Sequence, residues 1–144
     1  MHIIIASDHA GFTLKQLLIP YIISLGCTIN DMGPESDGGS CDYPDFAQKA
    51  CDSVLATGGL GILICGTGIG MSMAANRVPG IRAALCTSEF QARFSRKHNN
   101  ANILCLGSRI TGDALAKEIL ADFLAEEFEG GRHLVRIKKF DPKA

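Results

Sequence analysis

The segment Gly61-Ile62-Leu63-Ile64-Cys65-Gly66-Thr67-Gly68-Ile69-Gly70-Met71-Ser72 sets the fold class of this chain. Its first part is an uninterrupted apolar run, which is typical of a strand covered on both faces of a sheet. A glycine-rich turn follows at once, and a helical pattern begins at Met71. A buried strand that passes through a tight turn into a helix indicates a parallel α/β unit.

The same alternation of short β-rich runs and longer amphipathic stretches continues in both directions. The expected strands are 2–6, 28–31, 61–65, 81–86 and 102–106, and the expected helices are 13–25, 44–56, 71–76, 89–97 and 113–127. This order predicts one α/β domain over residues 1–144, a three-layer α/β/α Rossmann-like fold with a five-stranded parallel sheet. Pro20 predicts a kink in the first helix, and Ser88 is the expected N-cap of the fourth.

The composition is that of an ordinary globular protein. Its 14 basic and 15 acidic residues give a net charge of −1, which does not indicate a nucleic acid or an anionic membrane as a partner. The apolar start His2–Ala6 lacks the basic flank and the cleavage site of an export signal. We therefore expect a cytoplasmic protein whose six cysteines stay reduced, most of them as small buried hydrophobes.

Ligands of open α/β sheets bind beyond the carboxyl ends of the strands. This rule selects Ser7-Asp8-His9, Cys65-Gly66-Thr67-Gly68, Thr87 and Gly107-Ser108-Arg109. In the second of these segments, the glycine-rich turn would aim backbone N–H groups into one concavity, which suits a phosphate or a developing oxyanion. Cys65 stands at the mouth of the turn, where its thiolate is placed to remove a proton while the amides stabilise the resulting anion.

Three other interpretations of the Cys65 segment need weighing. A dinucleotide-binding fingerprint reads G-x-G-x-x-G, whereas these glycines follow G-x-G-x-G and lie far from the first strand. A cysteine phosphatase loop would need an arginine where Met71 stands. The third is a tight turn whose glycines serve only helix–sheet packing, and the loop by itself does not decide between that turn and a catalytic one.

Polar side chains at the ends of other elements also have two interpretations each. Asp8 either orients a substrate hydroxyl or caps the next helix, and His9 is either a substrate contact or a solvated residue at a strand end. His98, near the end of the fourth helix, is an acid–base group or a surface residue that compensates the helix dipole. Tyr43 is a candidate wall of the pocket.

Arginines provide the strongest indication of an anionic ligand. Arg109 follows the fifth strand, and Arg132 and Arg136 are four residues apart and so share one helical face. Guanidinium groups match phosphate oxygens bidentately. The alternative is a solvated basic tail, the usual state of a terminus. Because Gly130-Gly131 has the character of a bend, the tail 130–144 could instead reach a neighbouring subunit.

Six motifs, in this order, resemble those of type B ribose-5-phosphate isomerase. They are Ser7-Asp8-His9-Ala10-Gly11, Asp42-Tyr43-Pro44, Cys65-Gly66-Thr67-Gly68-Ile69-Gly70, Ser95-Arg96-Lys97-His98-Asn99, Gly107-Ser108-Arg109 and Glu129-Gly130-Gly131-Arg132-His133. The resemblance spans essentially the whole chain, and the combination is far more specific than any one motif. The wider family includes the subunits of galactose-6-phosphate isomerase.

The resemblance implies an aldose–ketose isomerase that interconverts D-ribose 5-phosphate and D-ribulose 5-phosphate through a cis-enediolate. Cys65 would be the base and His98 the residue that opens the furanose ring, with Thr67 beside the enediolate. The remaining contacts would be Asp8, Tyr43 and Asn99 to the sugar, the amides of Gly66, Thr67, Gly68, Ile69 and Gly70 to the enediolate, and His9, Arg109, Arg132 and Arg136 to the phosphate.

The resemblance also implies that no metal and no organic cofactor take part. It implies a homodimer with shared active sites, in which Arg132 and Arg136 come from the partner; whether dimers pair further stays open. Two alternative functions remain. One is the same chemistry on a hexose 6-phosphate such as allose or galactose 6-phosphate, and the other is a sugar-phosphate-binding module without catalysis, which would not need an acid–base pair such as Cys65 and His98.

Overall fold

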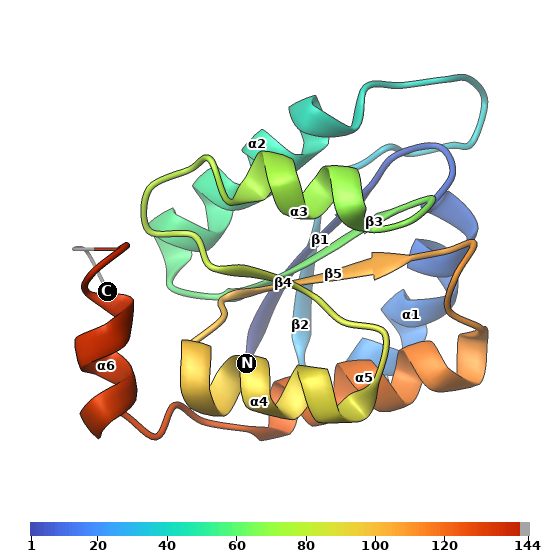
Figure 1. Cartoon of the computed structure of the whole chain (residues 1–144). Helices are drawn as coiled ribbons and strands as arrows, with labels where there is room; N and C mark the ends of the chain where they lie inside the picture. The colour runs from blue at the N-terminus through green and yellow to red at the C-terminus, as the bar shows by residue number, and fades with distance from the viewer. Residues whose placement is uncertain (142–144) are drawn as a thin grey trace.

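The computed structural model describes residues 1–141, in which strands and helices alternate (Figure 1). The strands are β1 (His2–Ser7), β2 (Thr28–Asp31), β3 (Leu60–Cys65), β4 (Ala83–Leu85) and β5 (Ile103–Gly107). The helices are α1 (Phe12–Ser24), α2 (Tyr43–Thr57), α3 (Ile69–Ala75), α4 (Glu89–Asn99), α5 (Asp113–Ala125) and α6 (Gly131–Ile137). All neighbouring strands are parallel, in the order β2-β1-β3-β5-β4, which confirms the predicted sheet.

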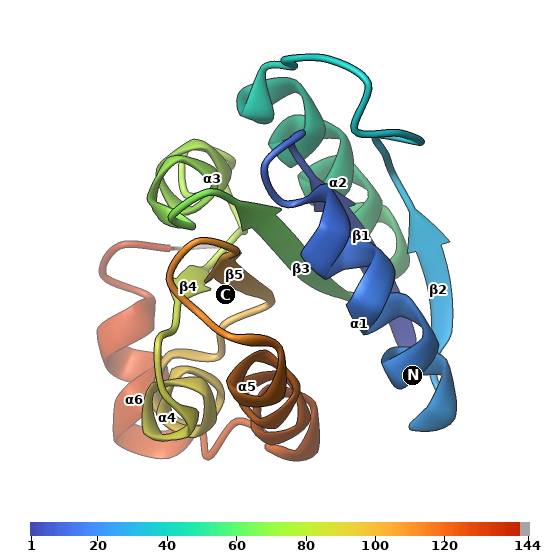
Figure 2. The same cartoon turned by 90° about the vertical axis from the view of Figure 1, so that its right-hand side faces the viewer.

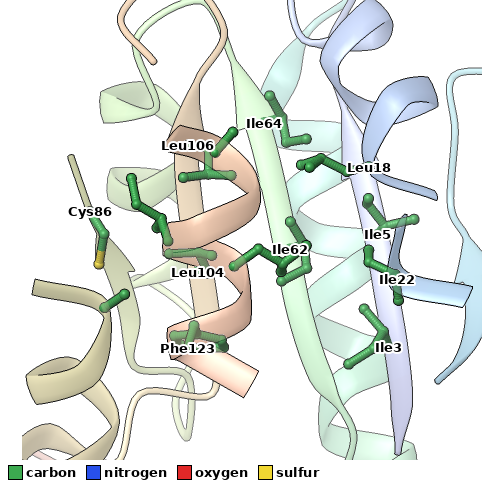
Figure 3. Close-up of a cluster of buried hydrophobic side chains, with 14 of the residues drawn as sticks. Ile3, Ile5, Leu18, Ile22, Ile62, Ile64, Cys86, Leu104, Leu106 and Phe123 are labelled. Atoms are coloured by element: carbon green, nitrogen blue, oxygen red, sulfur yellow. The ribbon is translucent and has the colours of Figure 1, made fainter. Parts of the chain in front are cut away.

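Helices cover both faces of the sheet, which gives the three predicted layers (Figure 2). Ile3 and Ile5 pack with side chains of α1, α4 and α5, whereas Ile4 and Ala6 pack with side chains of α2 and α3. Figure 3 shows the first of these two clusters, with Ile62 of β3 at its centre. The lack of polar alternation in β1 and β3 therefore has a direct cause, since both faces of these strands are buried.

The strand order fixes where a ligand can bind. Strand β2 lies on one side of β1 and β3 on the other, so the connections change direction between β1 and β3. At such a point the carboxyl ends of the two strands leave a crevice between diverging connections. We call the side of the sheet where the strands end the carboxyl edge and the opposite side the amino edge.

Several boundaries differ from the prediction for local reasons. Helix α1 runs through Pro20. This residue is exposed, so water can hydrogen-bond to the backbone carbonyl that loses its partner because proline has no N–H. Strand β4 is shorter than predicted because side chains replace strand partners: Asn102 accepts from the amide of Arg82, and Asn76 accepts from the amide of Ala83. Ser88 caps α4 as predicted, accepting from the amide of Gln91.

The C-terminal tail forms a helix of its own. Helix α6 occupies residues 131–137, as its pattern predicted, and follows Gly130 and Gly131, both of which have positive φ. The last three residues of the predicted tail lie outside the described residues. Within residues 1–141, no helix combines the length and the apolarity that crossing a membrane requires.

Candidate active site

Three of the predicted segments meet at the carboxyl edge. The amide of Asp8 donates to the carbonyl of Ile64 at 3.1 Å, which joins the ends of β1 and β3. The amide of Ser108 donates to the carbonyl of Cys65 at 2.9 Å, and its hydroxyl donates to the carbonyl of Ala10 at 2.8 Å. Asp8 and Cys65 therefore lie at the ends of neighbouring strands where the connections diverge, and the loop after β5 is hydrogen-bonded to both connections.

Cys65 ends β3 and points its sulfur into the glycine-rich turn. The side chain is 5% exposed, and the amide of Gly68 donates to Sγ at 3.1 Å. Gly68 has a φ of +77°, and a Cβ there would lie 2.9 Å from the carbonyl carbon of Leu106. Both conditions require glycine, so this residue holds the amide against the sulfur.

The rest of the loop carries further polar groups. The exposed Thr67 accepts at Oγ1 from the amide of Ile69 at 3.3 Å. Gly70 lies in the first turn of α3, and a Cβ there would be 2.8 Å from Cζ of Tyr43. The ring of Tyr43, the first residue of α2, thus lies against the loop.

Asp8 and His9 are both oriented by hydrogen bonds to backbone amides. The amide of Gly11 donates to Oδ1 of Asp8 at 2.9 Å, so this carboxylate holds the turn that precedes α1, although no side chain caps the helix itself. Nδ1 of His9 accepts from the amide of Cys41 at 3.3 Å. A neutral imidazole that accepts at Nδ1 carries its proton on Nε2, which is then available as a donor.

Arg109 completes the set at the carboxyl edge. Its amide donates to the carbonyl of Gly66 at 3.0 Å, and its guanidinium nitrogen Nη1 lies 3.4 Å from the position that a Cβ on Gly66 would occupy. The exposed guanidinium therefore lies over the glycine-rich loop. A positive charge beside loop amides suits a phosphate or another anion.

The structure does not bring the other predicted site residues to this edge. His98 and Asn99 end α4, just before β5 begins, and Arg132 and Arg136 lie on α6, at the opposite side of the sheet in Figure 1. Since Gly107 pairs with Cys65, the full length of β5 separates the two groups. At about 3.3 Å per residue this strand alone spans roughly 13 Å. Within one chain, His98 and Cys65 cannot contact the same small molecule at once.

His98 belongs to a cluster at the amino edge. Its ring stacks on the ring of His133, with centroids 4.1 Å apart and planes at 9°. Nε2 of each histidine faces Oε2 of Glu129, at 3.7 and 3.8 Å. A hydrogen bond from Lys97 holds the pKa of Glu129 below its ordinary value, while desolvation, and then the charges of His98 and nearby arginines, lower the pKa of His133.

A cavity of about 710 Å³ also lies away from Cys65. It is lined by the segment from Asn76 to Ala84 and by Ser95, Asn99, Ala101, Phe140 and Asp141. Arg82 and Asp141 form an ion pair of 2.6 Å beside it. Because Asn99 lines this cavity, the polar group predicted to bind sugar faces away from the Cys65 loop of its own chain.

Most of the cysteines are buried, as predicted. Cys51, Cys65, Cys86 and Cys105 are buried, and Cys27 and Cys41 are partly exposed. Burial raises the pKa of Cys51 to about 12 and that of Cys86 to about 11. These two thiols stay neutral at physiological pH and are chemically quiet.

Sequence reasoning assigned no role to three sets of supporting groups. The hydroxyl of Ser108 joins the loops after β1, β3 and β5. Lys15 is fully buried, and its ammonium donates to both carboxylate oxygens of Asp31 and to the carbonyl of Pro34, which anchors the segment that leads to Tyr43. Glu129 and His133 surround His98. Lys15 also carried a sequence signal, because a lysine that faces the sheet from a helix needs a partner for its charge.

Comparisons with known proteins identify the relatives of this chain. The model of the ribose/galactose isomerase family matches residues 3–140. Ribose-5-phosphate isomerase B of Escherichia coli is 43% identical over 133 residues, covering 91% of this chain and 88% of that protein. Ribose-5-phosphate isomerase B of Clostridium thermocellum superposes with a TM-score of 0.95 at 47% identity, over 99% of this chain and 96% of that one.

One similar structure carries a ligand. Ribose-5-phosphate isomerase B of Mycoplasma genitalium, with bound ribulose-5-phosphate, has a TM-score of 0.94 at 47% identity and covers 98% of this chain and 94% of that one. Identity of this size over nearly whole chains establishes common descent as well as a common fold. The chain therefore belongs to the ribose/galactose isomerase family.

Proposed function

We propose that this chain interconverts D-ribose 5-phosphate and D-ribulose 5-phosphate. The observation that carries the proposal is the sulfur of Cys65, which the amide of Gly68 holds at the carboxyl edge, where Asp8 follows the neighbouring strand β1. Arg109 supplies a positive charge at the same loop. The relative from Mycoplasma genitalium, which binds ribulose-5-phosphate, supports a five-carbon sugar phosphate as the ligand.

The proton transfer follows from the groups at this edge. Cys65, as the thiolate, takes the hydrogen of C2 from the open-chain aldose, and the electron pair of that bond forms the C1–C2 double bond of a cis-enediolate. The proton then returns to C1, while the hydroxyl proton of O2 passes to O1, which gives the ketose. The loop amides from Gly66 to Gly70 stabilise the negative charge on the two oxygens, and Thr67 lies alongside.

Substrate binding would use the remaining groups of the carboxyl edge. Asp8 and Tyr43 contact the sugar hydroxyls. Oδ1 of Asp8 accepts from the amide of Gly11, so Oδ2 is the oxygen that would accept from the sugar. His9, with its Nε2 proton, and Arg109 contact the phosphate. Binding by these groups requires neither a metal nor an organic cofactor.

The active site would be shared between two chains of a homodimer. His98 opens the furanose ring by acid–base catalysis, yet it lies across the sheet from Cys65 of its own chain, together with Asn99, Arg132 and Arg136. A two-fold dimer solves this by placing the amino edge of one chain against the carboxyl edge of the other. The partner then supplies ring opening, a sugar contact and two phosphate-binding arginines.

The rest of the proposal concerns the cell and the substrate class. We infer a cytoplasmic enzyme, because a catalytic thiolate needs reducing surroundings, acting on the small sugar phosphate without nucleic acid or membrane. A hexose 6-phosphate is the second candidate substrate, favoured only by the breadth of the family. Whether dimers pair further does not alter the chemistry.

A coupled assay on both substrate classes tests the proposal. We expect kcat/KM for ribose 5-phosphate to exceed that for allose and galactose 6-phosphates by at least about tenfold, which is a difference of roughly 1.4 kcal/mol in the barrier. The reaction in heavy water should also place deuterium on the sugar carbon. A protein that binds these sugars without exchange would be a sugar-phosphate-binding module, and a preference for hexose phosphates would assign the second substrate class.

A further inference from the structure

The cluster of His98, Glu129 and His133 brings three ligating side chains to one point. His98 ends α4, Glu129 lies in the connection after α5, and His133 lies on α6. The metal-ligating atoms of the three side chains all lie within 4.8 Å of one another. The two histidines face the same oxygen, Oε2 of Glu129, at distances beyond the 3.5 Å range of a hydrogen bond.

These separations are close to those of ligands around a metal ion. Two ligands that are each about 2.1 Å from a tetrahedral ion lie roughly 3.4 Å apart. The distances of 3.7 and 3.8 Å from Glu129 to the two imidazole nitrogens exceed that value by only a few tenths of an ångström. The stacked rings lie in nearly parallel planes, so their lone pairs lie in separate planes, and coordination of one ion requires the rings to tilt toward each other.

The surroundings already orient the three groups. Lys97 lies 3.2 Å from Oε1 of Glu129, which leaves Oε2 toward the histidines. The amide of Glu129 donates to the carbonyl of Lys97, and the side chain of His133 is only 9% exposed. Phe94 contacts His98 edge-on and limits its ring from the other side. The three side chains are therefore held near one another before an ion binds, and the tilt of the two rings is the change that coordination requires.

We propose that His98, Glu129 and His133 form a binding site for a divalent transition metal ion such as Zn²⁺ or Ni²⁺. Two imidazoles and one carboxylate favour these ions over Mg²⁺ and Ca²⁺, which prefer oxygen ligands. Three protein ligands leave positions open for water. The positive charges of Lys97, Arg132 and Arg136 oppose a cation, so binding should be weaker than at the same three ligands without neighbouring cations.

Occupancy of this site would inhibit the isomerase. This consequence rests on the proposed function, in which His98 opens the sugar ring. A metal ion bound to Nε2 of His98 takes the electron pair that accepts the proton, so the ring-opening step stops while Cys65 is untouched. The metal is thus an inhibitor, with no part in the reaction itself.

Calorimetric titration with Ni²⁺ tests the site directly, on protein free of a polyhistidine tag. Ni²⁺ is the better probe because imidazole suits it, whereas thiolates bind Zn²⁺ strongly and this chain has six cysteines. We expect one ion per chain for the wild type. His133→Phe keeps a ring against His98 but removes one ligand, and Glu129→Gln changes a side chain that is 45% exposed, so neither variant should unfold the protein.

Each variant should weaken Ni²⁺ binding more than about tenfold. Removing a residue that only hydrogen-bonds to a metal ligand already lowers metal affinity about 10- to 100-fold, and these variants remove a ligand itself. His2→Ala, which removes a histidine of β1, should bind like the wild type. No binding to the wild type, or equal binding to wild type, Glu129→Gln and His133→Phe, overturns the site. Inhibition by Ni²⁺ that persists in Glu129→Gln overturns its proposed consequence. The titration measures metal binding and does not depend on enzyme activity, so its result can be interpreted even if the proposed function is wrong.

Discussion

The backbone amide of Gly68 donates a hydrogen bond of 3.1 Å to the sulfur of Cys65. Only a residue with positive φ and no side chain places that amide there, because the space beyond Gly68 is filled by Leu85 and Leu106. The chain thus uses one glycine both to turn the backbone and to fix the proposed base. This relationship gives the first prediction.

Gly68→Ala should lower kcat for ribose 5-phosphate by at least about tenfold. Alanine at this φ costs roughly 1–2 kcal/mol, and its Cβ would force the loop away from Leu106, which moves the amide off the sulfur. Steady-state kinetics, with circular dichroism to verify folding, make the measurement. Gly39→Ala is the matched control, since a Cβ there meets no atom within 4 Å. A folded Gly68→Ala enzyme with wild-type kcat would show that the bond is irrelevant to catalysis.

His98→Ala should distinguish ring opening from proton transfer. A four-carbon aldose 4-phosphate cannot close a furanose ring, whereas ribose 5-phosphate does. The variant should lose about 10²- to 10⁴-fold in kcat/KM on ribose 5-phosphate, the usual contribution of acid–base catalysis, and far less on the shorter sugar. Asn99→Ala, which removes a sugar contact from the neighbouring position, should reduce both rates to similar extents. Equal losses for the two sugars in His98→Ala would exclude the assigned role.

Mixing two inactive variants should restore activity if the site is shared. Cys65→Ala and His98→Ala homodimers each lack one half of every site. Random re-pairing makes half of the dimers mixed, and each mixed dimer has one intact site, so about a quarter of wild-type activity should return. Refolding the two variants together and assaying isomerisation makes the test.

The matched control mixes Cys65→Ala with the double variant Cys65→Ala/His98→Ala. No pairing of those chains rebuilds a complete site, so activity should stay at background. If Cys65→Ala and His98→Ala mixtures also stay at background although mixed dimers are present, then both groups act within one chain or the pairing differs from the proposed one.

The buried thiol of Cys51 should make the fold sensitive to alkali. Its pKa is about 12 in the fold, because burial disfavours the thiolate, against 9.0 in the unfolded chain. Stability from this group is therefore complete below pH 9 and is lost progressively as the pH rises from 9 toward 12. Urea unfolding at a series of pH values should show a smaller decline above pH 9 for Cys51→Ala than for the wild type. Parallel declines would contradict the burial effect.

The fold could be predicted well because its strongest signals are local. The runs in β1 and β3 lack polar residues because helices cover both faces, and glycine-rich turns mark where strands pass into helices. The prediction for 81–86 was too long because Asn76 and Asn102 take over the hydrogen bonds of that segment, a long-range effect that no local pattern encodes. Asp8, Cys65 and Arg109 were placed together by the rule for strand ends, and the structure agrees.

The other half of the site depended on tertiary placement. Nothing in the sequence indicates that α6 folds back on α4 so that His133 stacks on His98, since the two residues are 35 positions apart. The separation of His98 from Cys65 by the length of β5 does follow from the predicted order of elements, since His98 precedes the fifth strand whereas Cys65 ends the third. The resemblance nevertheless assigned both residues to one site, and the partner chain that could reconcile the two lies outside what one sequence describes.

Transfer of the C2 hydrogen by Cys65 is tested most directly by measuring how fast deuterium from heavy water enters ribose 5-phosphate at equilibrium. NMR detects the exchange. Wild-type enzyme and Cys86→Ala, which removes another buried thiol, should both exchange the hydrogen. Cys65→Ala should exchange it more slowly by at least about 10²-fold, while calorimetry shows that the variant still binds the sugar phosphate. Exchange at the wild-type rate in Cys65→Ala would mean that a different group carries the proton.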